Sequence, residues 1–277
     1  MRWRPRGAVW LAAPAVLVLL LALAYPLAIV VWRSFADPTI GIGNYVWFFQ
    51  SEVNRTVLQR TFIVAGWVSL VCLVCAYPYA YLMTIVGKNM RLVLILCVLV
   101  PFWLSGVVRT LAWVILLQDS GVINSVLRDL GLAPVKLIRT LTGVVIGMTQ
   151  VLLPFMILPI YSVMRGIDTR LLQAARSLGA KPWRAFLQIY VPLSLPGVYA
   201  GVIIVFILSL GFYITPALLG GPRSTLLSTL VQNQVLSLLN WGRGGAMGAV
   251  LLVTTLVLLA IAAPLMRQKH TATRREV

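Results

Sequence analysis

The stretch TFIVAGWVSLVCLVCAYPYAYLMTIVG, from Thr61 to Gly87, contains no Asp, Glu, Lys or Arg. It is longer than the roughly 20 apolar residues that carry an α-helix across the hydrocarbon core of a bilayer. Because that core offers no water to the backbone, such a stretch must form a helix. The uncharged segment from Thr140 to Met164 is similar, and neither alternates as a barrel strand would. The sequence therefore predicts an all-α membrane protein.

Composition and charge agree with a membrane location. The 277 residues are 60% hydrophobic and 10% charged, whereas soluble domains carry about 25% charged residues. The formal net charge is +17, from 23 Lys and Arg against 6 Asp and Glu. Nucleic-acid binding needs a basic surface with stacking aromatics on a folded module, but these basic residues lie mostly in short connections between apolar runs. We interpret the charge as a topology signal and expect no nucleic-acid partner.

Six membrane spans are predicted, in a single transmembrane domain that covers residues 1–277. Lys and Arg are enriched in connections on the cytoplasmic side of a membrane. Here they are most frequent at the two termini and after the second and fourth spans, so both termini are expected in the cytoplasm. The uncharged segment Ser224–Gly242 is rich in amide side chains and is interpreted as a partly embedded external segment. The expected spans are Val9–Val31, Phe62–Val86, Leu92–Leu116, Leu141–Met164, Gly197–Leu219 and Gly245–Met266.

No residue cluster in the sequence predicts catalysis or metal binding. Cys72 and Cys75 have the spacing of a redox or metal pair, but neither His nor another Cys is near them, and cysteines in apolar runs usually serve as small packing residues. His270, the single histidine, lies in the basic tail. An enzyme needs a polar catalytic cluster, and none is evident. A secondary transporter needs inverted repeats and intramembrane ion ligands; it is kept as the alternative from another class.

Arg109 is the one charge well inside a predicted span. A charge buried in a membrane is costly and is a functional candidate by default. Alternatively, its long stem carries the guanidinium to the external interface, since Asp119 follows on the same side. The sequence leaves both interpretations open.

The connection between the fourth and fifth spans predicts two short helices at an angle, over residues 168–191. Asp168 can accept hydrogen bonds at the start of the first helix, and Gly179 can adopt the left-handed conformation that ends it. A proline then suits the first turn of the second helix. Pro192 and Pro196 are expected to interrupt the chain where it re-enters the membrane.

The first of these helices is amphipathic, because apolar residues recur along it at helical spacing and basic residues lie nearby. We call this helix pair, residues 168–191, the elbow. An amphipathic elbow can lie on the lipid surface, or it can dock into a groove on a soluble partner. The pattern alone leaves both possibilities open. The residues expected to share its apolar face are Leu171, Leu172, Ala175 and Leu178, and the basic ones are Arg170, Arg176, Lys181 and Arg184.

The same connection resembles the EAA motif of permease subunits of binding-protein-dependent ABC importers. Gln173-Ala174-Ala175 precedes Gly179 at the spacing of the motif, and Leu195-Pro196-Gly197 closes it. Gln173 stands where the motif has Glu, which removes a negative charge but keeps the hydrogen-bonding capacity. Further segments resemble the spermidine/putrescine branch of these importers: Pro101–Trp113, Gly121–Leu127, Leu158–Tyr161, Gly211–Gly221 and Asn240–Gly242.

The resemblance implies a multi-pass permease with the type I ABC importer fold in the bacterial inner membrane. It also implies an ATPase dimer, a second permease that is a distinct homologue, and an external solute-binding protein as partners. The chain has no phosphate-binding loop motif, so ATP and Mg²⁺ are expected on the ATPase, and this chain is expected to be no enzyme and to hold no cofactor. The residues expected to couple to the ATPase are Leu171, Gln173, Ala174, Ala175, Leu178, Gly179 and Ala180.

The resemblance further implies import of a small solute. A polyamine is the leading expectation; an aminoethylphosphonate, opine or other amino-acid-like solute is the alternative. A polycation would meet acidic or aromatic groups on its path. Arg109 would suit an anionic or zwitterionic solute instead, and because the resembling branch carries Arg here we interpret it as structural or gating. The candidate path residues are Trp103, Arg109, Trp113, Asp119, Tyr161, Phe212 and Tyr213.

Overall fold

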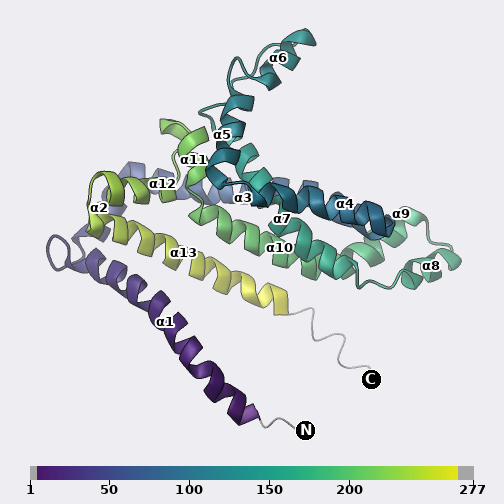
Figure 1. Cartoon of the computed structure of the whole chain (residues 1–277), viewed down its shortest axis with the longest axis horizontal. Coiled ribbons are helices and arrows are strands. Elements are labelled where there is room, and N and C mark those ends of the chain that lie inside the picture. The colour runs from purple at the N-terminus through teal and green to yellow at the C-terminus, as the bar shows by residue number, and fades with distance from the viewer. Residues whose placement is uncertain (1–4, 268–277) are drawn as a thin grey trace. The chain divides into compact units, whose positions relative to one another are not determined.

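The computed structural model describes the backbone of residues 5–267 and the side chains of residues 14 and 17–261. All regular structure in this range is helical (Figure 1), which confirms the predicted fold class. The expectation that both termini face the cytoplasm stays a prediction. Several basic residues on which it depends lie outside the described residues, as does His270; they are Arg2, Arg4, Lys269, Arg274 and Arg275.

Six helical segments of the described chain are long and apolar enough to cross a membrane. Their number confirms the sequence prediction, and each overlaps the expected span of the same rank. The bounds of the third and fifth differ most from expectation. The segments are Leu17–Ala36, Glu52–Ile85, Gly106–Asp129, Leu141–Met164, Pro182–Gly211 and Trp241–Ile261.

The third predicted span, Leu92–Leu116, is wrong as a single helix. α4 (Lys88–Leu99) passes into a short 3₁₀ turn, η1 (Val100–Trp103), and α5 (Gly106–Leu117) begins as a separate helix. Pro101 lies at this break and lacks the N–H that would continue the α-helical ladder. α5 therefore leaves the direction of α4 (Figure 1).

The fifth span begins and ends earlier than the predicted Gly197–Leu219. α9 (Pro182–Ala185), the π-helical η2 (Phe186–Tyr190) and α10 (Val191–Gly211) follow one another without a break. α11 (Ile214–Leu219) is a separate short helix. The second helix of the elbow is thus the first part of the fifth span.

The expectation that Pro192 and Pro196 interrupt the chain is wrong, and the π-helical turn before them gives a physical reason. The N–H of Val191 donates to the carbonyl of Phe186, five residues back. In a regular α-helix a proline ring presses against the carbonyl four residues earlier. A π turn is wider, so it leaves room for the ring of Pro192 and the helix continues.

The chain divides into two compact units, the first made of residues 1–55 and 230–253. In this unit α2 (Gly43–Gln50) is fastened to the end of α1 (Pro5–Ala36) by Asn44. The Nδ2 atom of Asn44 donates to the carbonyls of Ser34 and Asp37, at 2.9 and 2.7 Å.

The second unit, the remaining residues, is built around α3 (Glu52–Ile85), α7 (Leu141–Met164) and α10. α7 and α10 approach closely because Gly197 and Gly201 stand where a side chain would clash. A Cβ on Gly197 would lie 2.8 Å from the carbonyl oxygen of Pro159, and one on Gly201 would lie 2.8 Å from the sulfur of Met156. Membrane helices associate largely through this kind of small-residue packing.

α6 (Val122–Asp129) follows α5 and lies apart from the bundle of α3, α7 and α10 (Figure 1). The buried Asn124 fixes its loop. Its Nδ2 donates to the carbonyls of Gln118 and Val135, at 3.2 and 3.1 Å, and its Oδ1 accepts the N–H of Val135 at 2.8 Å. Gly131, with a φ of 73°, ends the helix in the left-handed conformation.

The segment Ser224–Gly242 contains α12 (Leu227–Gln232) and the π-helical η4 (Asn233–Ser237). None of the six candidate spans of the described chain falls in it. The prediction that this segment is not a seventh span is confirmed. Its partial embedding in the membrane stays a prediction.

Candidate functional site

The elbow between the fourth and fifth spans has the turn chemistry that its sequence predicts. The Oδ1 atom of Asp168 accepts the N–H of Arg170 at 2.9 Å, where α8 (Arg170–Ser177) begins. Gly179, with a φ of 88°, ends that helix. Its N–H donates to the carbonyl of Arg176 at 2.9 Å, and the N–H of Ala180 donates to that of Ala175 at 3.0 Å. This pair of bonds defines a Schellman motif, which fixes the direction in which the chain leaves the helix.

The apolar residues of α8 do not share one face, so that prediction is wrong. Leu172 and Ala175 are half-buried, and Leu172 packs against the core of its own chain. Leu171, Ala174 and Leu178 are exposed at the spacing i, i+3 and i+7; Leu178 is 89% exposed. One face therefore packs α8 against the rest of its own chain, and the other is exposed.

The remaining predicted coupling residues also lie at the surface of the elbow. Gln173 and Gly179 are exposed, and Ala180 is half-buried. The open face is bordered by exposed cations, and the nearest acid in sequence, Asp168, is used at the start of α8. An apolar strip with a basic rim fits a groove with an acidic rim. The cations are Arg170, Arg176, Lys181 and Arg184.

An aromatic cluster joins the elbow to the membrane helices. Tyr81 on α3 lies 5.2 Å from Phe186 and 5.3 Å from Tyr190, centroid to centroid, and these two rings of η2 stack on each other at 5.4 Å. Beside them the hydroxyl of Tyr77 is 2.9 Å from that of Ser194 on α10. Tyr81 packs edge to face on both rings of η2, so these contacts join the start of the fifth span to α3. This cluster was missed from the sequence alone. Its signal was the spacing of four residues between the aromatic residues Tyr77 and Tyr81, and again between Phe186 and Tyr190.

We call the predicted third and fifth spans, Leu92–Leu116 and Gly197–Leu219, the interrupted spans, and their breaks lie next to each other. α5 and α11 both begin just after a break, and a Cβ on Gly106 would lie 4.0 Å from the side chain of Ile214. The buried hydroxyls of Thr110 and Thr215 lie 3.2 Å apart. Interrupted helices that meet within a bundle are typical of solute sites in membrane transporters.

Arg109 belongs to this meeting point. Its Nη1 donates to the carbonyl of Pro101 at 3.2 Å, and its guanidinium lies 5.7 Å from the ring centroid of Phe102. The side chain thus links α5 to η1 across the break between them. It contacts no acidic residue that the structure describes. Its Nε is buried and has no hydrogen-bond partner among the described residues.

The other predicted path residues do not gather in one place. Trp113 donates its Nε1–H to Gln150 of α7 at 3.3 Å. Trp103 is 90% exposed, and Asp119 is exposed beyond the end of α5. Tyr161 lines a cavity beside α8 instead.

Phe212 and Tyr213, the last two predicted path residues, form the break between α10 and α11. The carbonyl of Phe212 accepts the hydroxyl of Ser228 at 2.7 Å. Tyr213 is 43% exposed. These two residues therefore belong with Arg109 and Thr110 to the region of the interrupted spans.

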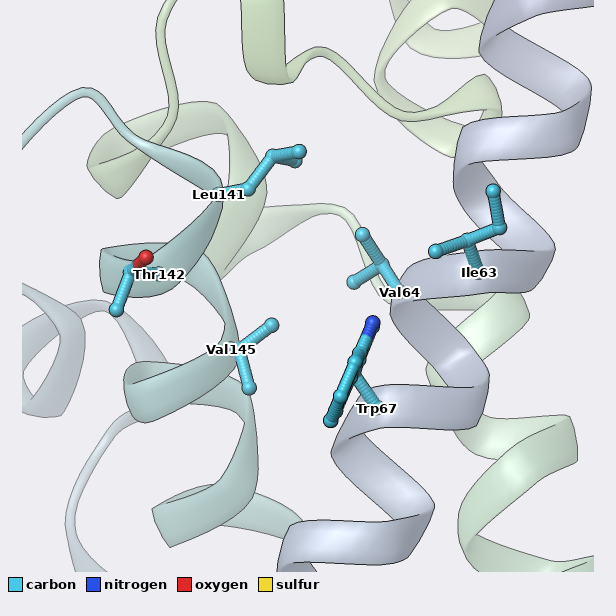
Figure 2. A pocket seen from close by; sticks show the side chains of 6 residues that line it. All are labelled: Ile63, Val64, Trp67, Leu141, Thr142 and Val145. Atoms are coloured by element: carbon cyan, nitrogen blue, oxygen red, sulfur yellow. The ribbon is translucent and has the colours of Figure 1, made fainter.

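A groove of about 310 Å³ lies between α3 and α7, near the start of α7. Figure 2 shows Val64 and Trp67 of α3 facing Leu141 and Val145 of α7 across it. Thr142 is its only lining residue with a polar side-chain atom besides the indole N–H. This lining suits an acyl chain or an apolar helix rather than a hydrophilic solute.

The cysteines take no part in these sites. Cys72 is fully buried in the core, and its thiol donates to the carbonyl of Thr149 at 3.6 Å, which agrees with a packing role. Cys75 and Cys97 are exposed, and all three thiols are free.

The part of the chain that the structure describes is all-helical, with six candidate spans, short helices that begin at the breaks after η1 and α10, and an exposed amphipathic elbow, as in a transport permease. The chain belongs to the family of binding-protein-dependent transport system inner membrane components, whose model matches residues 8–269. It is a permease subunit of an ABC importer in the inner membrane, and ATP is hydrolysed by a separate subunit. Importers of this family work with ATPase and solute-binding partners.

Several relatives have names that state a solute, among them two permeases named for spermidine and putrescine. The chain is 33% identical over 224 residues to the spermidine/putrescine transport system permease protein PotB of Haemophilus influenzae, across 80% of this chain and 78% of that one. It is 32% identical over 230 residues to the protein of the same name from Escherichia coli, across 82% of this chain and 83% of that one.

A solved structure shares the fold. A chain of a bacterial alginate ABC transporter, in complex with a periplasmic protein that holds an alginate pentasaccharide, superposes with a TM-score of 0.77. The match covers 96% of this chain and 97% of that one at 21% identity. It shows the type I importer permease fold and carries nothing about the solute.

Proposed function

We propose that this chain is the permease of a polyamine importer. The observation that carries the proposal is the similarity to permeases named for spermidine and putrescine, which extends over four fifths of the chain. The exposed aromatic groups Trp103 and Tyr213 near the interrupted spans supply surfaces that suit an alkylammonium ion.

The test is uptake by the importer reconstituted in proteoliposomes with its ATPase and its solute-binding protein. We expect ATP-dependent uptake of radiolabelled spermidine and putrescine and no uptake of aminoethylphosphonate or an opine. Uptake of a phosphonate or an opine with none of either polyamine would overturn the polyamine assignment and leave the permease function standing.

A zwitterionic or anionic solute is the second candidate, and Arg109 is the observation that favours it. Its Nε is buried without a partner among the described residues, and a cation at the interrupted spans opposes the entry of a polycation. In the polyamine case Arg109 serves only to fasten the break through its bond to Pro101.

Arg109→Gln separates these two cases. Glutamine keeps a polar N–H donor at this position but carries no charge. For a polyamine importer we expect uptake within about twofold of wild type, because the positive charge of Arg109 does not bind a cationic solute. A loss of more than roughly tenfold, the effect of removing a charged hydrogen bond to solute, would instead favour an anionic or zwitterionic solute.

The assembly around the chain is part of the same proposal. α8 docks its exposed face into a cleft of the ATPase, which binds ATP and Mg²⁺, and both termini lie on that cytoplasmic side. A second, distinct permease covers the exposed apolar side chains of α5, and an external binding protein delivers the solute. Closure of the two ATPases on ATP moves the elbow and, through the aromatic cluster, the membrane helices; this is coupling of two sites by a two-state element.

A further inference from the structure

A cavity of about 300 Å³ lies where the ends of α3 and α7 meet α8. Arg91 and Arg165 are among the residues that line it, and none of its lining residues is acidic. Cationic and hydroxyl donors around one cavity suit a multiply charged or oxygen-rich anion. The hydroxyl-bearing lining residues are Tyr81, Thr84, Tyr161, Thr169 and Tyr190.

Arg91 is held in position by its own chain. Its Nε donates to the carbonyl of Met83 at 2.9 Å and its Nη2 to that of Val86 at 3.1 Å. A guanidinium has five N–H donors, so three of them remain for a ligand. Arg165 is exposed at the end of α7, and its side chain makes no hydrogen bond within the described part of the chain.

The two arginines also lie at helix ends, which offers a simpler explanation for them. The last turn of a helix carries a partial negative charge that a cation stabilises. Arg91 meets the end of α3, and Arg165 follows the end of α7. That role explains the charges, but it does not require a cavity with five hydroxyl groups.

The cavity lies at the ends of two candidate membrane spans, which is where lipid headgroups are met. α3 ends at Ile85 and α7 ends at Met164, and α4 begins nearby at Lys88. Ile85, which is 63% exposed, and the half-buried Leu172 give the charged wall an apolar border. A phospholipid can contact the charged wall with its phosphate and the apolar border with its glycerol and acyl chains. A soluble anion can contact only the charged wall. Basic pockets between membrane helices are a recurrent site for anionic headgroups.

We propose that this cavity binds the phosphate of an anionic phospholipid such as phosphatidylglycerol. The headgroup bridges Arg91 of α4 and Arg165, which follows α7, beside Thr169 at the start of α8. Inorganic phosphate has the same charge chemistry without the acyl chains. The site lies beyond the import function: it makes the joint between the elbow and the membrane helices depend on the composition of the bilayer.

The experiment uses the purified complex of permease and ATPase in detergent. Its thermal midpoint and lipid affinity are measured with phosphatidylglycerol, with phosphatidylcholine, whose headgroup has no net charge, and with inorganic phosphate. We expect phosphatidylglycerol alone to raise the midpoint. Arg165→Gln should weaken its affinity about fivefold, the effect of one basic residue at an anionic surface. Arg128→Gln, the same charge change on exposed α6, should leave the affinity unchanged.

Three results would overturn the proposal. Equal phosphatidylglycerol affinity in Arg165→Gln and wild type would leave the arginines as helix caps. An equal effect of inorganic phosphate would assign the cavity to a soluble anion. Loss of the ATPase from the Arg165→Gln complex in phosphatidylcholine alone would assign Arg165 to a protein contact. None of these readouts involves transport, so failure of the polyamine assignment leaves the test intact.

Discussion

Gly179→Pro is expected to abolish coupling between ATP hydrolysis and import while the chain still inserts in the membrane. Gly179 has a φ of 88°, and proline is fixed near −65°. The N–H of Gly179 also donates to the carbonyl of Arg176, and proline has no N–H. The substitution therefore breaks the turn that sets the direction of α8 relative to α9.

The expected loss is large, because removing the turn costs on the order of 3 kcal/mol, roughly a hundredfold in the population of the correct elbow. Uptake and solute-stimulated ATP hydrolysis by the reconstituted importer measure it. Gly131→Pro is the matched control: Gly131 ends α6 in the same conformation, with a φ of 73° and an N–H that donates to Arg128 at 2.9 Å. That variant should keep its ATPase bound. Normal uptake by Gly179→Pro would refute the coupling role of the elbow.

Gly197→Val is expected to have the largest effect on stability. A Cβ at this position would lie 2.8 Å from the carbonyl oxygen of Pro159 and 3.0 Å from the Cα of Ile160. Both are backbone atoms, so no side chain can rotate away, and α7 and α10 must separate. Overpacking of this kind costs about 1–3 kcal/mol and more where the backbone must move.

The measurement is the thermal midpoint of the purified permease in detergent, together with its yield from the membrane. Gly211→Ala serves as the control on the same helix, since a Cβ there meets nothing within 4 Å. We expect Gly211→Ala to match wild type. A midpoint for Gly197→Val that also matches wild type would show that the helices are not packed as closely as described.

The helix count was predictable from the sequence because uncharged stretches such as Thr61–Gly87 leave the backbone no other way to cross a bilayer. The turn at Gly179 was predictable for a similarly local reason, since glycine adopts a positive φ at little cost. Both predictions depend on a few neighbouring residues and on no distant contact.

The breaks within the predicted third and fifth spans were not predictable, because proline alone does not mark them. Pro154 and Pro159 lie inside the unbroken α7, and Pro192 and Pro196 inside the continuous fifth span. Only Pro101 coincides with a break. The second break follows Gly211 and contains no proline. Whether a proline breaks a membrane helix depends on how neighbouring groups satisfy the freed carbonyls, which sequence does not show.

The faces of α8 needed the structure for a related reason. Leu171, Leu172 and Leu178 are alike in sequence, yet Leu172 packs inward and Leu178 is exposed. The helix has only eight residues, so its orientation is set by what it packs against. The predicted path residues do not gather in one place, since Tyr161 lines the cavity beside α8 and Arg109 lies at the break before α5. Their roles in transport remain predictions.

The docking of α8 on the ATPase can be tested most directly by photo-crosslinking from position 178 in the assembled, transport-competent complex. Leu178 is 89% exposed at the end of α8, and Leu130, 69% exposed at the equivalent place after α6, is the matched position. We expect a crosslink to the ATPase from position 178 and none from position 130. Crosslinks from position 178 to lipid alone, in a complex that still imports solute, would contradict it.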